Sequence, residues 1–139
     1  MQYPKQNLDS IFGEPIHIYS RAQATEDGSL IDITEAACEA GFRLPVAMTA
    51  AAWADCVVWN DADSMRQTAQ NEAGRLWDVL WMASLAARRA GNSQRIAFTV
   101  HRVPRGGRSP HSRPTTLHMC IGPGDDGAPV ITILLPTED

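Results

Sequence analysis

Two histidines and a cysteine, His101, His118 and Cys120, are the side chains of this sequence whose types and spacing most favour chemistry. The segments around them alternate polar and apolar residues as strands do, so all three are expected on one face of adjacent strands. A histidine beside a cysteine can create a nucleophile, and two histidines with a cysteine can hold a metal ion. The third interpretation is a semi-polar sheet surface that faces solvent. We prefer it, because neither segment contains a carboxylate to orient a histidine, and we expect no cofactor and no metal.

Arginines are concentrated in and around the segment that contains His101. Between residues 88 and 113 the chain has seven arginines and no acidic residue, although its net charge is −4. We predict that these charges lie along one side of the molecule and that four of them contact a partner: Arg102, Arg105, Arg108 and Arg113. Arginine binds phosphate well, but residues 104–113 lack the aromatic side chains that stack on bases. Nucleic-acid binding is therefore the alternative to an acidic protein partner or a solvated loop.

The four tryptophans divide between two helical patterns. Trp77 and Trp81 share one helix face, within residues 76–87, which are apolar around most of the helix circumference. A helix of that kind belongs in the core, so we predict that both are buried. For Trp53 and Trp59 two interpretations stay open. They either join an aromatic core or act as partly exposed anchors for a protein partner, where tryptophan is enriched.

The first part of the chain predicts short strands and helices, and the last third predicts strands in which polar and apolar residues alternate. The first part predicts short strands at residues 15–19, 29–33 and 44–48. Helices are expected after Ser20, Thr34 and Thr49, which are residue types that cap helix starts. A long helical pattern covers residues 63–90, and Gly74 is the position at which this helix would split or kink. Arg75 is expected in surface ion pairs three residues from Glu72 and from Asp78. The last third predicts strands at residues 94–103, 114–121 and 129–135.

These elements predict an α+β fold. It has N-terminal short strands and helices, a central Trp-rich buried helix, and a C-terminal three-stranded antiparallel meander packed on that helix. The turn residues 122–127 join the last two strands as a hairpin, whereas the connection at 104–113, rich in Gly, Pro and Ser, is predicted to be mobile. Residues 1–14 form an N-terminal arm, and residues 15–139 form a single globular domain of ordinary size.

Composition narrows the class of protein further. With 44% hydrophobic and 20% charged residues, the chain is not a disordered one. No apolar run reaches the roughly 18–20 residues that span a bilayer, and the N-terminus lacks the apolar region of a secretion signal. We therefore expect a cytoplasmic protein with no membrane partner. Three widely spaced cysteines predict free thiols, and Cys38 and Cys56 lie in helical patterns that favour burial.

Three segments together resemble an uncharacterised domain family carried by bacterial plasmids, phages and integrative elements. They are Ile18–Ala24 with Asp27-Gly28, Gly74–Met82, and Gly122–Asp125 with Pro129–Pro136. The resemblance extends over most of residues 16–139. It implies a mobile-element setting and no established activity. Small accessory proteins in that setting often blunt host defences such as CRISPR or restriction systems.

The leading hypothesis is a non-enzymatic mobile-element accessory protein that binds a host or element protein. Its sharpest form is an inhibitor of a host defence system, anti-CRISPR or anti-restriction. The first alternative is a nucleic-acid-binding accessory protein that uses the Arg-rich residues 102–113. The second is a small enzyme or metal site at His101, His118 and Cys120. The sequence favours no oligomeric state.

Overall fold

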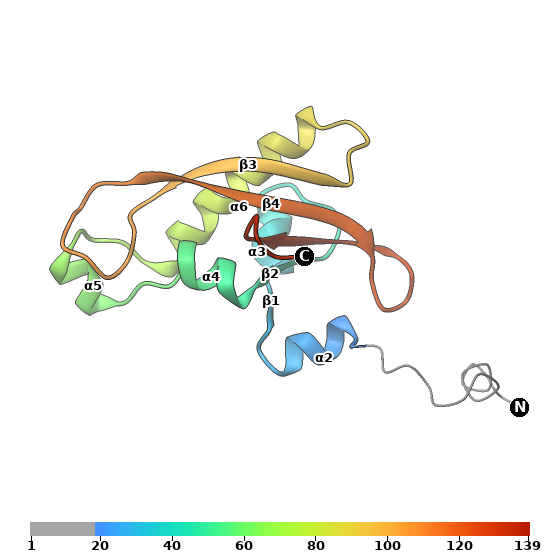
Figure 1. The fold of residues 1–139 in the computed structure, drawn as a ribbon, viewed down its shortest axis with the longest axis horizontal. Coiled ribbons are helices and arrows are strands. Elements are labelled where there is room, and N and C mark those ends of the chain that lie inside the picture. Colours follow the sequence, from blue (N-terminus) through green and yellow to red (C-terminus); the bar gives the residue numbers. More distant parts are fainter. Residues whose placement is uncertain (1–18) are drawn as a thin grey trace, which may run out of the picture.

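The computed structural model describes residues 19–139, which form five helices and five strands (Figure 1). The helices are α2 (Arg21–Glu26), α3 (Thr34–Glu39), α4 (Ala50–Cys56), α5 (Asp61–Arg66) and α6 (Glu72–Arg89). The strands are β1 (Leu30–Asp32), β2 (Val46–Thr49), β3 (Arg95–Arg102), β4 (Arg113–Pro123) and β5 (Pro129–Leu134). The predicted arm at 1–14 and most of the predicted strand at 15–19 lie outside the described residues. No helix within residues 19–139 has the length and apolar character that a membrane span requires.

All five strands form one mixed sheet in the order β1-β2-β5-β4-β3. The antiparallel pairs β3–β4 and β4–β5 are those predicted, and the hairpin turn lies between β4 and β5. However, β5 also pairs in parallel with β2, and β2 pairs with β1. The predicted three-stranded meander is therefore wrong as a complete sheet, because it forms one side of a five-stranded sheet.

The reason lies in the composition of β2. Its residues Val46, Ala47 and Met48 are buried, with at most 3% of each exposed. A strand without a polar face is typical of a sheet interior with both faces covered. Val46 and Ala47 point to opposite faces of the sheet and both are buried, and β2 lies inside the sheet, between β1 and β5.

The core lies between the sheet and helices α3, α4 and α6. Alternate residues of the last three strands point into it, among them Phe98, Leu117, Met119 and Ile133, which confirms the predicted alternation. The opposite sheet face carries exposed polar residues, including Thr99. The sheet is therefore covered by large helices on one side, as a two-layer α+β fold requires.

Helix α2 is fastened to the tip of the β4–β5 hairpin. The Asp125 carboxylate accepts hydrogen bonds from the backbone N–H groups of Arg21 (2.8 Å) and Ala22 (2.9 Å), and these bonds lower the pKa of Asp125. The Arg21 guanidinium donates to Thr132 Oγ1 and to the Ile131 carbonyl, each at 2.7 Å. Two of the segments that carry the family resemblance therefore meet at this contact.

The predicted helix over residues 63–90 is two helices, α5 and α6. Asn60 caps α5 by accepting from the Asp63 N–H at 2.9 Å, and Asn71 caps α6 by accepting from the Gly74 N–H at 2.7 Å. An asparagine cap satisfies the free N–H groups of a new helix. The residues between Arg66 and Glu72 are therefore not helical. Gly74 lies in the first turn of α6 and does not kink it.

Helix α6 buries one face and not, as predicted, most of its circumference. Its buried apolar side chains are Val79, Leu80 and Ala83, whereas Trp77 is 41% and Trp81 is 44% exposed. The prediction that both tryptophans belong to the core is wrong. Helix α6 packs on the outside of a single sheet, so only one of its apolar faces can be covered.

Candidate functional site

Large apolar side chains remain exposed along the outer surface of α6. The indole rings of Trp77 and Trp81 stack with their centroids 6.1 Å apart and their planes at 22°. Met82 is 36% exposed, and Leu85, one turn beyond Trp81, is half-buried. We call these four residues the α6 apolar face. Contiguous exposed apolar surface marks interaction sites, where tryptophan is enriched.

A groove of about 430 Å³ lies between the C-terminal half of α6 and strand β3. Met82, Leu85, Ala86 and Arg89 line it on the helix side, and residues 96–99 line it on the strand side. Because β3 is the last strand of the sheet, no strand pairs with its outer edge in the described part of the chain. This α6–β3 groove therefore connects the α6 apolar face to an open sheet edge.

Along β3, the backbone N–H and C=O groups of successive residues point alternately toward β4 and toward the open edge. Ile121 donates its N–H to the Gln94 carbonyl at 2.9 Å, and this pair continues the β3–β4 register. Hydrogen-bonded and non-bonded pairs alternate in an antiparallel ladder, so the even-numbered residues of β3 bond to β4. The odd-numbered residues present their N–H and C=O groups at the open edge. Two of these, Ala97 and Thr99, line the groove.

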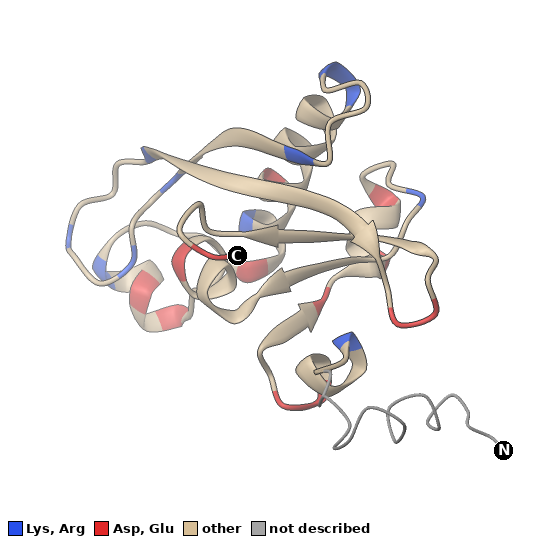
Figure 2. Cartoon of the chain, turned by 45° about the vertical axis from the view of Figure 1, so that its right-hand side comes forward, with Lys and Arg blue, Asp and Glu red and all other residues tan. Residues whose placement is uncertain are grey.

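One end of the groove is basic. Arg89, in the last turn of α6, is the lining residue that carries this charge, and it forms no ion pair within residues 19–139. Arg88 lines a different pocket, beside residues 40–42, and Arg95 at the start of β3 does not line the groove. Arg95 donates instead to His118 Nδ1 at 2.8 Å and to the Glu138 carbonyl at 2.9 Å. In Figure 2 the blue end of α6 lies far from the red turn of the β4–β5 hairpin.

The seven arginines of residues 88–113 lie in two groups. Figure 2 shows them divided between the C-terminal end of α6 and the connection beyond β3, with the length of β3 between the two groups. The second group lies beside the acidic helix α5. The arginines therefore follow the β3 edge of the sheet in two separate groups, because β3 has arginines at both of its ends.

Arg75 fixes the N-terminal part of α6 from inside the protein. Its side chain is buried, and its guanidinium lies over the Trp59 ring, 4.5 Å from the centroid. Nε donates to the Val57 carbonyl at 3.1 Å, and Nη1 donates to the Val103 carbonyl at 3.0 Å and to Gln70 Oε1 at 2.9 Å. The guanidinium therefore links α6 to the segments that follow α4 and β3.

The predicted surface ion pairs of Arg75 with Glu72 and Asp78 do not occur in the described structure. Burial lowers the pKa of Arg75. Burial also raises the pKa of Asp78, against the opposing charge of Arg75. The i, i+3 spacing was correct for a helix, but Arg75 points inward to backbone carbonyls.

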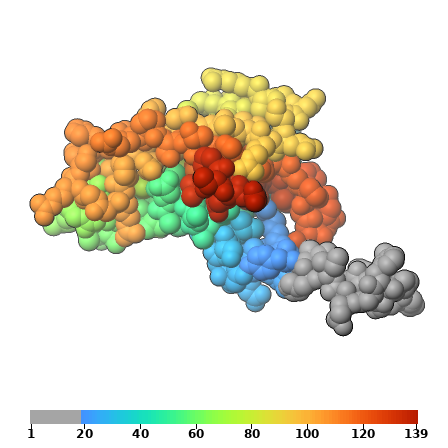
Figure 3. All heavy atoms as spheres, in the orientation of Figure 1, coloured from blue at the N-terminus to red at the C-terminus, as the bar shows by residue number. Residues whose placement is uncertain are grey.

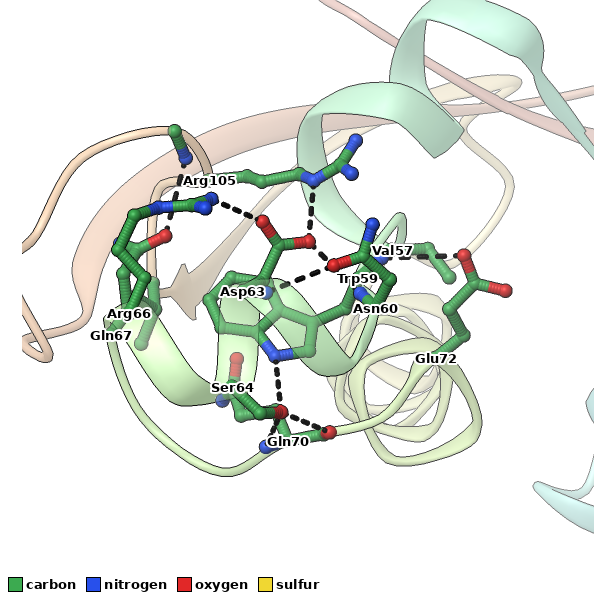
Figure 4. Close-up of polar contacts among 12 residues, drawn as sticks. Val57, Trp59, Asn60, Asp63, Ser64, Arg66, Gln67, Gln70, Glu72 and Arg105 are labelled. Carbon is green, nitrogen blue, oxygen red and sulfur yellow. Dashed lines mark hydrogen bonds and ion pairs between the residues drawn. The ribbon is translucent and has the colours of Figure 1, made fainter.

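Two of the four arginines predicted to bind a partner are held in ion pairs. Arg102 Nη2 lies 2.9 Å from Asp55 Oδ1, and Arg105 Nε lies 2.7 Å from Asp63 Oδ2. Arg66 pairs with the same Asp63 carboxylate (Figure 4). Burial raises the pKa of Asp63, but hydrogen bonds from Arg105, a backbone N–H and Arg66 outweigh it and leave the pKa lowered. Arg102 and Arg105 therefore neutralise acidic residues of this chain.

The connection at residues 104–113 is held against α5. The Gln67 side-chain amide donates to the carbonyls of Pro104 at 2.8 Å and Ser109 at 2.9 Å, and its oxygen accepts from the Gly106 N–H at 3.2 Å. Figure 3 shows this orange connection in contact with green α5. One glutamine therefore satisfies three backbone groups of the connection, and the mobility of this connection stays a prediction.

The other predicted partner residues have different surroundings. Arg108 and Arg113 are exposed and form no ion pair among the described residues. Trp59 is buried and donates its indole N–H to Ser64 Oγ at 3.0 Å, so the core interpretation is correct for Trp59. Trp53 is half-buried and packs against the core.

His101, His118 and Cys120 lie on one sheet face, but the structure does not bring the three together. The register sets His101 opposite Pro114 and His118 opposite Ala97. These positions are four residues apart, or about 13 Å along the strand. No group of three or more His, Cys, Asp or Glu side chains in residues 19–139 is arranged to hold a metal ion. The geometry therefore supports the solvent-facing interpretation.

All three cysteines are free. Cys56 is buried, and burial raises the pKa of its thiol to about 11. It is therefore protonated at neutral pH and lacks the thiolate that acts as a nucleophile. Cys38 is exposed, contrary to the predicted burial, because it lies on the outer face of α3.

Sequence reasoning missed the α6 apolar face and Arg89 as candidate binding residues. The indication that could have found them is the apolar circumference of residues 76–87 in a chain with one predicted sheet. A helix on the outside of one sheet buries one stripe. The second apolar stripe must then remain exposed or meet a partner.

Comparison with known proteins identifies the family of this chain. No curated protein and no solved structure shows significant similarity to this chain. A family model described as a family of unknown function, DUF6573, matches residues 10–139. This match confirms the resemblance to an uncharacterised domain family and includes the α6 apolar face, the α6–β3 groove and the Asp125 contact. Because the match covers nearly the whole sequence, the chain belongs to the DUF6573 family of unknown function.

Proposed function

We propose that this protein acts by binding another protein through the α6 apolar face and the adjoining α6–β3 groove. The observation that carries the proposal is the exposure of the stacked Trp77 and Trp81 rings on a helix whose opposite face is in the core. Covering such rings gains roughly 25 cal/mol for each Å² of apolar surface removed from water. Aromatic anchors of this kind carry most of the binding energy in many interfaces.

The way α6 is held supports this proposal. Val79, Leu80 and Ala83 fix its inner face in the core, and Arg75 fixes its N-terminal part by three hydrogen bonds. An anchor on a rigid element loses little conformational freedom when it binds. More of the apolar contact energy is then available for affinity.

The mobile-element setting that the sequence resemblance implies gives the proposal its sharpest form. In that form the partner is a host protein, and a component of a CRISPR or restriction system is the first candidate to test. The protein would act as an inhibitor by covering a surface of the defence component, without catalysis.

Site-specific photo-crosslinking in the native host tests the proposal. A benzoylphenylalanine at position 82 should form a covalent adduct with one partner protein, whereas the same group at position 116, on the opposite sheet face, should not. The double substitution Trp77→Ala and Trp81→Ala should abolish the adduct. Met65→Ala, which removes an apolar side chain that is 90% exposed on α5, should leave it intact. Adducts that persist without the two tryptophans would contradict the proposal.

The alternative proposal is nucleic-acid binding through residues 102–113. Its support is the exposure of Arg108 and Arg113, which no ion pair neutralises in the described structure. It predicts retention on DNA or RNA that weakens with salt, because phosphate contacts release counterions. Retention that disappears in the double variant Arg108→Ala and Arg113→Ala, with the tryptophans intact, would favour this alternative.

A further inference from the structure

We infer that the α6–β3 groove binds an extended segment of the partner as a sixth strand of the sheet. The segment has apolar side chains at alternate positions and an acidic residue at the end next to Arg89. This inference rests on the proposed function, because it specifies how a protein partner is recognised at the same site.

The backbone of β3 supplies the first part of the argument. Ala97 and Thr99 line the groove and, by the alternation set at Gln94 and Ile121, point their N–H and C=O groups at the open edge. Two residues therefore offer two donors and two acceptors, spaced as a ladder requires. An extended segment that pairs with such an edge gains main-chain hydrogen bonds whatever its sequence.

Side chains above the edge supply the specificity. Successive residues of a strand point to opposite faces, so alternate residues of a bound segment would point toward α6. There they would meet Met82, Leu85 and Ala86, the apolar wall of the groove. The residues between them would point to the solvent-facing side of the sheet, where Thr99 is exposed. An apolar–polar alternation is the matching sequence pattern.

The charge of the groove fixes one end of the segment. Arg89 is one of the lining residues, which include no acidic side chain. It has no ion-pair partner in the described residues. A carboxylate is the complementary group, and arginine binds carboxylates with charge-assisted hydrogen bonds.

A second copy of this chain fits the edge poorly. Strand β3 begins with Arg95, ends with Arg102 and contains no acidic residue. Antiparallel pairing of two β3 strands would place Arg95 of one copy near Arg102 of the other. Like charges opposite each other destabilise a strand pair, so the edge is suited to a different, acidic segment.

Peptide binding tests the inference directly. The probes are two fluorescein-labelled nine-residue peptides in which valine alternates with threonine, one with two aspartates at its amino end and one with them at its carboxyl end. Fluorescence anisotropy against the full chain should detect binding of at least one probe. The same peptide with lysines for aspartates should bind at least tenfold more weakly. Absence of binding by both aspartate probes would overturn the inference.

Two substitutions at one position separate backbone pairing from side-chain contact. Thr99→Pro removes an N–H that faces the open edge and keeps the ladder to β4, and edge strands tolerate proline at such positions. Thr99→Pro should bind the aspartate probe at least tenfold more weakly than the parent. Thr99→Val, which keeps the N–H, should bind this probe as the parent does. Equal binding by the two variants would contradict an added strand. Circular dichroism and the thermal midpoint check that both variants are folded.

A charge exchange gives a second test that does not depend on the fold of the proline variant. Arg89→Glu should weaken binding of the aspartate probe and strengthen binding of the lysine probe. Arg43→Glu, at another exposed arginine, should change the binding of neither probe. An unchanged preference in Arg89→Glu would contradict the acidic end of the segment.

The remaining outcomes distinguish this inference from the proposed function and from other occupants. A photo-crosslinked partner that requires Trp77 and Trp81 but binds Thr99→Pro equally well would leave the proposed function standing and refute the added strand. A dimer that Thr99→Pro dissociates would assign the edge to a second copy. Slow amide exchange of Ala97 and Thr99 in the free monomer would assign it to another part of this chain.

Discussion

Arg75 illustrates how one side chain decides the placement of a helix. Its planar guanidinium reaches two backbone carbonyls and a glutamine while it covers the Trp59 ring. Lysine offers a point charge without this fork geometry. The sequence spacing placed Arg75 near Glu72 and Asp78 on a helix, but the inward direction depends on carbonyls at Val57 and Val103. Those contacts are far away in the chain, so local spacing does not reveal them.

Neighbouring residues of α6 should differ sharply in their effect on stability. Leu80→Ala should lower the free energy of unfolding by about 2–5 kcal/mol, because Leu80 is fully buried. Trp81→Ala should lower it by about 1 kcal/mol or less, because Trp81 is 44% exposed and its ring stacks on the exposed Trp77. Urea unfolding of both variants measures the difference. A larger loss for Trp81→Ala would return this residue to the core.

Asp63 should make stability depend on acid pH. Its pKa in the folded protein is lowered, so its stabilising effect is complete above the ordinary aspartate value of about 3.9. The effect is lost as the pH falls through the lower folded value. The free energy of unfolding should therefore fall less between pH 5 and pH 3 in Asp63→Asn than in the parent. Equal pH dependence of the two proteins would show that the carboxylate is not stabilised in the fold.

At the scale of elements, short-range features were predictable and long-range pairing was not. Ser20 and Thr49 cap helices as predicted, because a cap acts on backbone groups two or three residues away. The predicted cap at Thr34 is wrong, because Thr34 is the first residue of α3 and Ile33, which precedes it, makes no side-chain cap. The period-2 segments gave the last three strands for a similar local reason. The β2–β5 pair joins residues more than eighty positions apart, and no local pattern specifies which of several apolar strands will become neighbours.

The attachment of α2 to the hairpin can be tested at this scale. Asp125→Ala removes the acceptor for two N–H groups of α2, so amide exchange in α2 should become faster while the sheet stays protected. Asp126→Ala is the matched control, because its carboxylate bonds to Ala128 within the turn. Hydrogen exchange followed by mass spectrometry measures both. Equal exchange of α2 in the two variants would mean that other contacts hold the helix.

At the scale of the whole molecule, the sequence identified the aromatic and basic residues but not which of them reach the surface. Trp77 and Trp81 were assigned to the core and Arg105 to a partner, and the structure reverses these positions. A helix with two apolar stripes is ambiguous until its packing is known. An arginine is equally ambiguous until its neighbouring carboxylates are known. Both ambiguities concern tertiary contacts, which composition and periodicity do not contain.

Hydroxyl-radical footprinting of the complex with the photo-crosslinked partner tests the central claim most directly. The method reads tryptophan and methionine side chains, and the protein carries an internal control in Met65, which is far more exposed than Met82. Trp77, Trp81 and Met82 should be oxidised in the free protein and protected in the complex, while Met65 reacts equally in both. Protection of Met65 with unchanged oxidation of the two tryptophans would contradict the claim that the α6 apolar face binds the partner.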